Sequence, residues 1–321
     1  MAQRLSQRRA RGLGSDPTLS RGGHHMTGRI VVGIDGSQPS GNALEWAVAR
    51  ARLGGEQLEL INTYSLTADI DFYGYQRTAA SQPVEWFIEF SEEVLDAAAA
   101  RVRELAPDLT CTTTSQVGHP AHVLAAASEG ADALVVGRRG LGSAASALLG
   151  SVSNRLTIQA RCPLVVVGGD ELPTTGPIVV GVDESEFGTN ALRYAIGEAA
   201  VRGTSVRAVA AYEIPYQALR VVPDPELVAR MGANVEAEAA GTITRALEEA
   251  QKTEPASVSV DHVVVEGHAA HAILGQAEDA QLIVVGTHGK GLIRRILLGS
   301  VSRQVLSDAD RPVAVIDLPG T

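Results

Sequence analysis

Cysteine, lysine and long hydrophobic runs are all scarce in this chain of 321 residues. The two cysteines, Cys111 and Cys162, do not recur in the internal repeat described below, which disfavours a disulfide framework or a metal site. Scarce cysteine also favours a reducing, cytoplasmic location. No apolar run approaches the roughly 20 residues that a membrane-spanning helix needs. We therefore expect a cytoplasmic protein without a membrane span or a metal centre.

An excess of basic charge is also missing from most of the chain. Residues 1–28 hold five arginines and one aspartate and lack the apolar core of a secretory signal, so we expect a disordered basic tail or an over-long start before Met26. Beyond residue 28 the chain carries 22 basic and 36 acidic side chains. General nucleic-acid binding needs a basic footprint, so nucleic acid is not an expected partner.

What the chain does contain is a repeat. Gly137-Arg-Arg-Gly140, nine residues and Gly150-Ser-Val-Ser153 return 149 residues later as Gly286-Thr-His-Gly289, nine residues and Gly299-Ser-Val-Ser302. Glycine costs backbone entropy wherever it is not needed. Because the spacing is kept to the residue in both copies, it indicates that these positions require glycine.

Strand-like apolar segments alternate with helical segments in each half, for example at 30–35 then 40–53, and at 178–183 then 186–202. This alternation predicts an α/β protein of two doubly wound parallel-sheet domains, covered on both faces, at residues 29–168 and 177–317. The polar, Pro- and Gly-rich segment 168–177 would separate the two domains.

Two turns in each half follow predicted strands and could meet. Doubly wound sheets bind ligands beyond the carboxyl ends of the strands, where the chain order reverses. If the first and fourth strands are neighbours, Asp35 faces the loop 137–143 and Asp183 faces the loop 286–292. Glycines let backbone N–H groups approach anionic oxygens, and the Gly-Ser pair begins a helix whose N-terminus suits phosphate. Positive charge would come from Arg138 and Arg139 in the first half, and in the second half from His288, Lys290, Arg294 and Arg295. We infer a phosphate-bearing ligand in each half.

Other chemistries are less well supported. The P-loop pattern is absent, and no nucleophile has an evident base. The pairs His119/His122 and His268/His271 give at most two metal ligands each, so solvation at helix starts is the better interpretation. We therefore expect no catalytic residues. A slow ATPase or a nucleotide-dependent transferase stays open as the alternative, with Asp35 and Asp183 as its repeated candidate bases, and so does a scaffold that has lost its ligand.

The pattern Gly-x2-Gly-x9-Gly-Ser, with the Val-Gly-[Ile/Val]-Asp opening and the closing Pro-[Leu/Val]-x-Val strand, resembles the ATP-binding branch of the universal stress protein family in both halves. The resemblance implies a five-stranded parallel sheet of order 3-2-1-4-5 in each half, with ATP, possibly with Mg²⁺, at the glycine loop. It also implies a regulatory role in stress or growth adaptation that depends on nucleotide. Adenine would meet the backbone of Thr63 and Ala211. The last strands would pair as in a family dimer, here within one chain, and we further expect a homodimer through C-terminal strands and an unidentified protein partner.

The predicted ligand contacts of the first half are Gly33, Asp35, Thr63, Gly137, Arg138, Arg139, Gly140, Leu141, Gly142, Ser143, Gly150, Ser151, Val152 and Ser153. Those of the second half are Gly181, Asp183, Ala211, Gly286, Thr287, His288, Gly289, Lys290, Gly291, Leu292, Gly299, Ser300, Val301 and Ser302. The halves differ after the acid, where Asp35-Gly36-Ser becomes Asp183-Glu184-Ser. Glu184 would repel an anion and Lys290 would attract it. We therefore expect the two sites to bind nucleotide with unequal affinities, without predicting which site binds more tightly.

Overall fold

The computed structural model describes residues 28–64, 84–140, 149–169, 172–214, 225–255, 257–289 and 298–317. The first half contains β1 (Arg29–Gly33), α1 (Gln38–Gly54), β2 (Gln57–Tyr64), α2 (Val84–Leu105), β3 (Cys111–Val117), α3 (Pro120–Ala127), β4 (Ala133–Gly137), α4 (Ser151–Gln159) and β5 (Leu164–Val167). The second contains β6 (Ile178–Gly181), α5 (Glu186–Arg202), β7 (Val206–Tyr212), α7 (Pro225–Ala250), β8 (Val260–Glu266), α8 (Ala269–Gly275), β9 (Leu282–Gly286), α9 (Ser300–Asp308) and β10 (Val313–Ile316).

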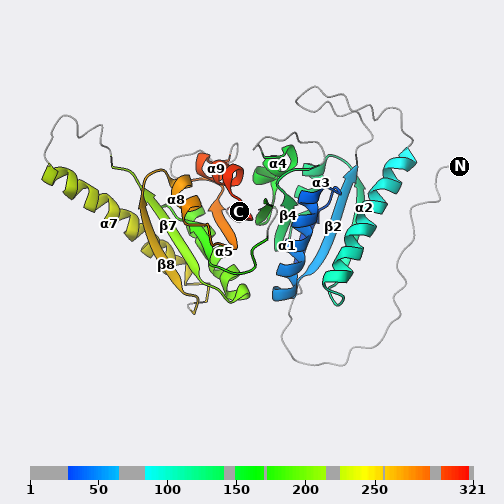
Figure 1. The fold of residues 1–321 in the computed structure, drawn as a ribbon, viewed down its shortest axis with the longest axis horizontal. Coiled ribbons are helices and arrows are strands. Elements are labelled where there is room, and N and C mark those ends of the chain that lie inside the picture. Colours follow the sequence, from blue (N-terminus) through cyan, green and yellow to red (C-terminus); the bar gives the residue numbers. More distant parts are fainter. Residues whose placement is uncertain are drawn as a thin grey trace, which may run out of the picture.

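The strands form one ten-stranded sheet in the order β3-β2-β1-β4-β5-β10-β9-β6-β7-β8 (Figure 1). Every pair within a half is parallel. Counted within each half, the strands follow the predicted order 3-2-1-4-5. The two halves meet where β5 and β10 pair antiparallel, with Val166 opposite Val313. The prediction that the last strands pair within one chain is therefore confirmed.

The expected homodimer through C-terminal strands is not compatible with this arrangement. Strand β10 lies between β9 and β5, and β5 lies between β4 and β10, so both edges of each strand are already paired. The sheet ends instead at β3 and β8. A homodimer of this chain would need another surface.

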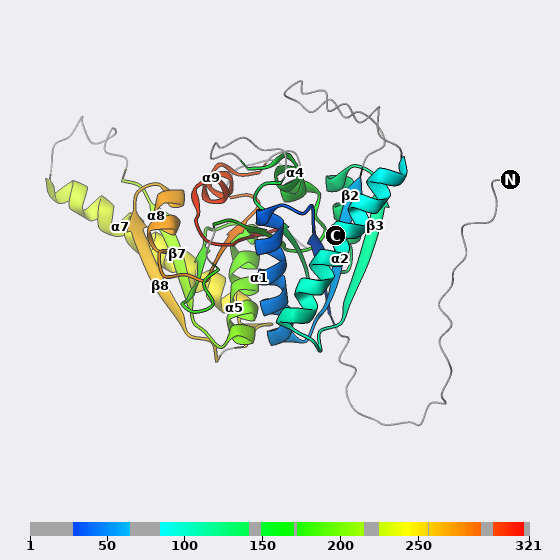
Figure 2. The ribbon, with the colours of Figure 1, turned by 45° about the vertical axis from the view of Figure 1, so that its right-hand side comes forward.

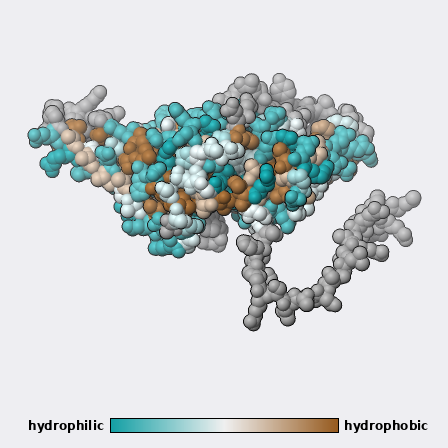
Figure 3. Space-filling model, turned by 60° about the horizontal axis from the view of Figure 1, so that its bottom comes forward, coloured by the Kyte–Doolittle hydropathy of each residue, from teal (hydrophilic) through white to brown (hydrophobic). Residues whose placement is uncertain are grey.

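The core consists of two apolar layers that run across both halves of the sheet. Helices α1, α2, α5 and α7 cover one face, and α3, α4, α8 and α9 cover the other (Figure 2). Covering on both faces explains why β4 and β5 are nearly continuous runs of Leu and Val. The face shown in Figure 3 is mainly hydrophilic, with apolar residues in separate patches. No helix within the described ranges has the length and the apolar character needed to cross a membrane.

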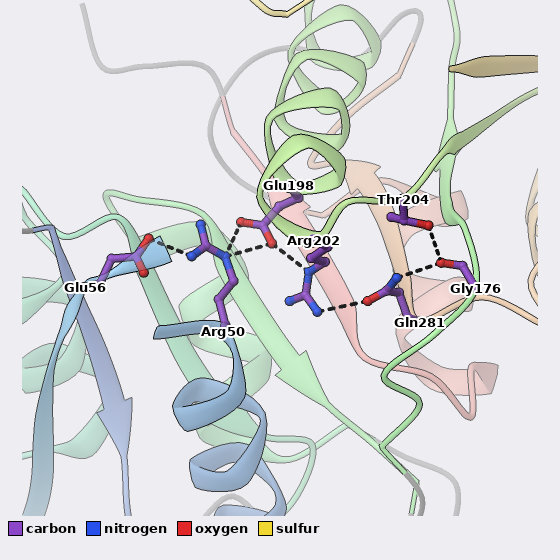
Figure 4. A network of polar contacts seen from close by, with 7 residues as sticks. All are labelled: Arg50, Glu56, Gly176, Glu198, Arg202, Thr204 and Gln281. Carbon is purple, nitrogen blue, oxygen red and sulfur yellow. Dashed lines mark hydrogen bonds and ion pairs between the residues drawn. The ribbon is translucent and has the colours of Figure 1, made fainter. Parts of the chain in front are cut away.

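The segment between the halves is held at both ends. Asn42 of α1 donates from its side-chain amide to the carbonyl of Gly169 at 2.9 Å. The carbonyl of Gly176 accepts from Thr204 Oγ1 at 2.8 Å and from Gln281 Nε2 at 2.6 Å (Figure 4). The connection is thus fastened to the first half at its start and to the second half at its end.

Candidate functional site

The acid turn after the first strand of each half has the same geometry. Asp35 Oδ1 accepts from the backbone N–H of Ser37 at 3.0 Å and from its hydroxyl at 2.6 Å. Ser37 Oγ also accepts from Ser40 N at 3.3 Å and so caps α1. Asp183 accepts the same two bonds from Ser185, which caps α5. Each carboxylate is therefore fixed by the serine that starts the following helix.

The glycine turn lies directly against this acid. Strands β1 and β4 are neighbours, as are β6 and β9. A Cβ atom on Gly140 would lie 2.2 Å from Asp35 Oδ2, and one on Gly289 would lie 2.6 Å from Asp183 Oδ2. A side chain at either glycine would therefore displace the carboxylate of the facing aspartate. The predicted meeting of the acid turn and the glycine turn is confirmed in both halves.

Two other glycines of the motif are required by packing. A Cβ on Gly137 would lie 2.6 Å from the carbonyl carbon of Pro39, at the start of α1. A Cβ on Gly286 would lie 2.8 Å from Phe187 Cβ, at the start of α5. Close approach of strand and helix accounts for both residues, whatever else they contact.

The glycines at the ends of β1 and β6 have a similar role on the opposite face. A Cβ on Gly33 would lie 2.9 Å from Leu124 Cδ1 of α3, and one on Gly181 would lie 2.5 Å from Ile273 Cδ1 of α8. The residues predicted to offer backbone to adenine, Thr63 and Ala211, lie near the carboxyl ends of β2 and β7. Both are thus at the edge of the sheet that carries the acid turns.

Hydrogen bonds close the glycine loop onto the helix that follows it. In the first half, Gly150 N donates to the carbonyl of Arg138 at 2.9 Å. The Ser153 hydroxyl donates to the same carbonyl at 2.9 Å and to the carbonyl of Gly150 at 3.2 Å. Ser153 is only 2% exposed, so its hydroxyl belongs to the closure of the loop.

The second half closes its loop in a related way. Gly299 N donates to the carbonyl of Thr287 at 2.8 Å, and the buried Ser302 hydroxyl donates to the carbonyl of Gly286 at 2.6 Å. The last serine of each Gly-Ser-Val-Ser motif therefore has a structural role that the sequence interpretation had assigned to ligand contact.

The helices that follow the glycine loops begin without a side-chain cap. Gly150 and Gly299 occupy the cap positions of α4 and α9, and within the described residues no side chain bonds to the first turn of either helix. Ser151 and Ser300, the first helical residues, are exposed, whereas Val152 and Val301 are partly buried. Backbone N–H groups of a first turn have no partner inside the helix, and they carry partial positive charge. These two helix starts therefore fit an anionic group.

Arg138 does not supply charge to the first crevice, contrary to the prediction. Its guanidinium reaches across the junction to the C-terminal end of α9, where it donates to the carbonyl of Ser307 at 3.4 Å and to that of Ala309. Burial, and then the neighbouring Arg139, lower the pKa of Arg138, opposed by Asp310 and Asp308. Cations are favoured at helix C-termini. Because Arg138 belongs to the first half and α9 to the second, this contact joins the two halves.

Thr287 stands where the first half has Arg138, and it remains within its own half. Its hydroxyl donates to Asp317 Oδ1 at 3.0 Å, and its side chain is buried. The next residue, His288, packs its ring against Phe187 with the centroids 5.2 Å apart. Both ring nitrogens of His288 are buried and have no hydrogen-bond partner within the described ranges. The second loop thus places a polar ring next to the start of α5.

The remaining predicted contacts are only partly placed. Arg139 is half-buried and follows Arg138 in the closed loop. Leu141, Gly142, Ser143, Lys290, Gly291 and Leu292 lie outside the described residues. Glu184 lies 4.0 Å from Arg245 of α7, measured from Oε1 to Nη2. Its negative charge is therefore partly offset.

The serines that hold the acids, Ser37 and Ser185, were missing from the predicted site. A signal was present in the sequence, because both halves read Asp-x-Ser immediately before a helix. Serine is a favoured helix cap, and its hydroxyl can bond two neighbours at once.

Comparisons with known proteins show what the chain as a whole is similar to. The family model described as the universal stress protein family matches residues 26–168 and 174–317. Universal stress protein Rv2005c of Mycobacterium tuberculosis is 31% identical over 299 residues, which cover 89% of this chain and 96% of that protein. Universal stress protein Rv1996 of the same organism is 32% identical over 308 residues, covering 90% and 95%. The crystal structure of a universal stress protein from Archaeoglobus fulgidus has a similar fold, with a TM-score of 0.64 and 20% identity over 92% of this chain and all of that one.

Proposed function

Because the chain belongs to the universal stress protein family, we propose that each half binds an adenine nucleotide and that occupancy regulates a partner or an assembly during stress or growth adaptation. One observation carries the proposal. In both halves a carboxylate held by a serine lies against a glycine whose added Cβ would displace that carboxylate, beside the start of a helix for which the described residues supply no side-chain cap. Packing explains Gly137 and Gly286, but it does not explain why, among the residues that the structure describes, the following helix has no side-chain cap in either half.

The residues present fit a nucleotide. The N–H groups at the start of α4, together with the exposed Ser151 hydroxyl, would hold phosphate oxygens, and the start of α9 with Ser300 would do so in the second half. Asp35 and Asp183 would accept from ribose hydroxyls or hold Mg²⁺, which prefers oxygen ligands. Bound ATP would bring a negatively charged triphosphate, which the start of α4 would stabilise in the first half and the start of α9 in the second.

We propose that the two sites have unequal affinities, with the second site the tighter. The first loop commits Arg138 to the junction, so the guanidinium adds little charge to the first crevice. In the second half, Arg245 partly offsets the negative charge of Glu184, and the polar ring of His288 lies next to the start of α5. Charge and donors near a phosphate site both strengthen anion binding.

We propose binding rather than turnover as the activity. Hydrolysis would need a general base directed at the water that attacks the γ-phosphate. The repeated candidates are Asp35 and Asp183, and Oδ1 of each already accepts two hydrogen bonds from the cap serine. This arrangement suits a carboxylate that positions a ligand.

The first experiment identifies the ligand. Purified protein is denatured, and the released small molecules are analysed by mass spectrometry, while nucleotide-free protein is titrated with ATP by calorimetry. We expect an adenine nucleotide and two binding events of different affinity. A chain that releases no nucleotide and binds none would refute the proposal. Multiple turnovers of ATP that are lost on Asp35→Asn with Asp183→Asn would favour the enzyme instead.

Separate substitutions assign the two events. Gly140→Glu should remove the weaker event and Gly289→Glu the tighter one, because a side chain at either position meets the acid. Gly275→Glu is the matched control, since no atom lies within 4 Å of its added Cβ. Equal losses from the two site variants would contradict the asymmetry, and an effect of the control would contradict the assignment of the site.

A further inference from the structure

The first helices of the two halves, α1 and α5, meet at the junction of the sheet (Figure 2). Arg50 of α1 donates from Nε to both carboxylate oxygens of Glu198 of α5, at 2.7 and 3.0 Å (Figure 4). These residues are 148 positions apart. The same offset relates the cap residues Ser37 and Ser185, so Arg50 and Glu198 are equivalent positions of the repeat. A position that contacts its own equivalent lies on the pseudo-two-fold axis of the molecule.

Around this contact the charges are balanced and nearly buried. Arg50 also bonds to Glu56 at 2.6 Å, and Glu198 accepts from Arg202 at 3.0 Å. The guanidinium of Arg202 lies 5.0 Å from the ring centroid of Trp46, across the junction. The four charged side chains are between 6% and 11% exposed. Burial lowers the pKa of Arg50, but the carboxylates of Glu198 and Glu56 outweigh it and leave that pKa raised.

The two halves contribute different parts of this network. Gly54 stands where the second half has Arg202, and a Cβ on Gly54 would lie 2.2 Å from Nη1 of Arg50. Thr204 stands where the first half has Glu56, and it bonds to the carbonyl of Gly176. The first half contributes Arg50 and Glu56 and the second contributes Glu198 and Arg202, so only pairing of the two different halves places opposite charges in contact at the axis.

We propose that the Arg50–Glu198 pair, on the surface where α1 and α5 meet, selects which half pairs with which. It favours pairing of the first half with the second over pairing of either half with the same half of another chain. Two copies of the first half would bring two arginines together at the axis, and two copies of the second half would bring two glutamates together. Two like charges brought together in a buried contact are unfavourable even though each keeps the partner in its own half, Glu56 or Arg202, and such a contact is one way in which an interface rejects a wrong partner. This selection is independent of the nucleotide proposal, since neither residue lies at the crevices.

A charge-reversal cycle in the full chain tests the proposal. Glu198→Arg recreates, within one chain, the contact that Arg50 would make with its own copy, and Arg50→Glu recreates the contact between two glutamates. The double variant restores opposite charges at the axis, and the cycle cancels the effects of Glu56 and Arg202. Opening of the junction is measured by hydrogen exchange of the β5 and β10 amides, together with the urea midpoint. The exposed pair Arg101–Glu45, which lies within the first half, provides the control reversals.

We expect each single reversal to speed exchange in β5 and β10 by about tenfold or more, which corresponds to about 1.4 kcal/mol. The double variant should exchange at least about tenfold more slowly than the product of the two single effects predicts, and the control reversals should leave exchange unchanged. A double variant that shows the sum of the single effects would overturn the proposal, as would equal acceleration in the outer strands β3 and β8. If a reversal prevents folding, the cycle is run with Arg50→Gln and Glu198→Gln, where additive losses again refute the selection.

Discussion

The two serines of the first Gly-Ser-Val-Ser motif should respond oppositely to replacement by alanine. Ser153 is buried and donates to two loop carbonyls, of Arg138 at 2.9 Å and of Gly150 at 3.2 Å. Ser151 is exposed at the first position of α4. We therefore predict that Ser153→Ala lowers stability and that Ser151→Ala lowers nucleotide affinity.

The magnitudes follow from the contacts. Removing a partner from a buried polar group costs about 1–3 kcal/mol. Because the Arg138 carbonyl keeps its bond from Gly150 N, we place Ser153→Ala at the lower end, about 1 kcal/mol. An exposed substitution usually changes stability by less than about 0.5 kcal/mol, so Ser151→Ala should unfold like the wild type. A hydrogen bond to a charged group contributes about 1.5–3 kcal/mol, which predicts a loss of affinity of about tenfold or more.

Urea denaturation is measured on nucleotide-free protein, because a bound ligand would itself raise the apparent stability. ATP affinity is then measured by calorimetry on both variants. Loss of stability in Ser151→Ala equal to that in Ser153→Ala would refute the assignment of roles. So would an unchanged ATP affinity in Ser151→Ala, since its hydroxyl is the side-chain donor exposed at the start of α4.

Three further outcomes are expected. Gly137→Ala should lower the urea midpoint even without nucleotide, because its Cβ would lie 2.6 Å from the Pro39 carbonyl carbon. Gly140→Ala should chiefly weaken ATP binding in calorimetry. If Gly140→Ala instead lowered the midpoint and Gly137→Ala weakened only binding, the assignment of Gly137 to packing and Gly140 to the site would be wrong. Arg138→Ala should lower the free energy of unfolding in urea by about 1–2 kcal/mol, the upper part of the range for a partly buried cation at a helix C-terminus; an unchanged midpoint would argue that the contact of Arg138 with the end of α9 does not stabilise the junction. Burial raises the pKa of Cys162 to about 12, so its alkylation by iodoacetamide at pH 8 should be slow in the folded protein and accelerate as pH rises; rapid labelling would contradict the burial.

The fold could be predicted because its signals are local. Strands covered on both faces must be continuous apolar runs, and β4, β5 and β9 read that way in the sequence. Helices α1 and α5 begin at serine caps and end at glycines with positive φ, Gly55 at 81° and Gly203 at 64°. The strand order came from the family resemblance, and the sequence alone did not contain it.

The site was only partly predictable because one residue type serves two purposes. A glycine reads the same in sequence whether it lets a ligand approach, as we propose for Gly140, or lets a helix pack, as Gly137 does against Pro39. The direction of Arg138 was unpredictable for a different reason. The carbonyl of Ala309, to which it donates at the end of α9, lies 171 positions further along the chain.

Symmetry explains where the two halves had to differ. A contact between equivalent positions on a two-fold axis is made by identical residues in a homodimer, so it can never be a pair of opposite charges. A tandem chain is free of this restriction, and Arg50 and Glu198 use that freedom at the axis. The acid turns lie away from the axis, where each half makes its own contacts, so symmetry does not require the residues that hold the acid to differ there. The serine that holds Asp35 is accordingly repeated at Asp183, whereas the charges at the junction are not.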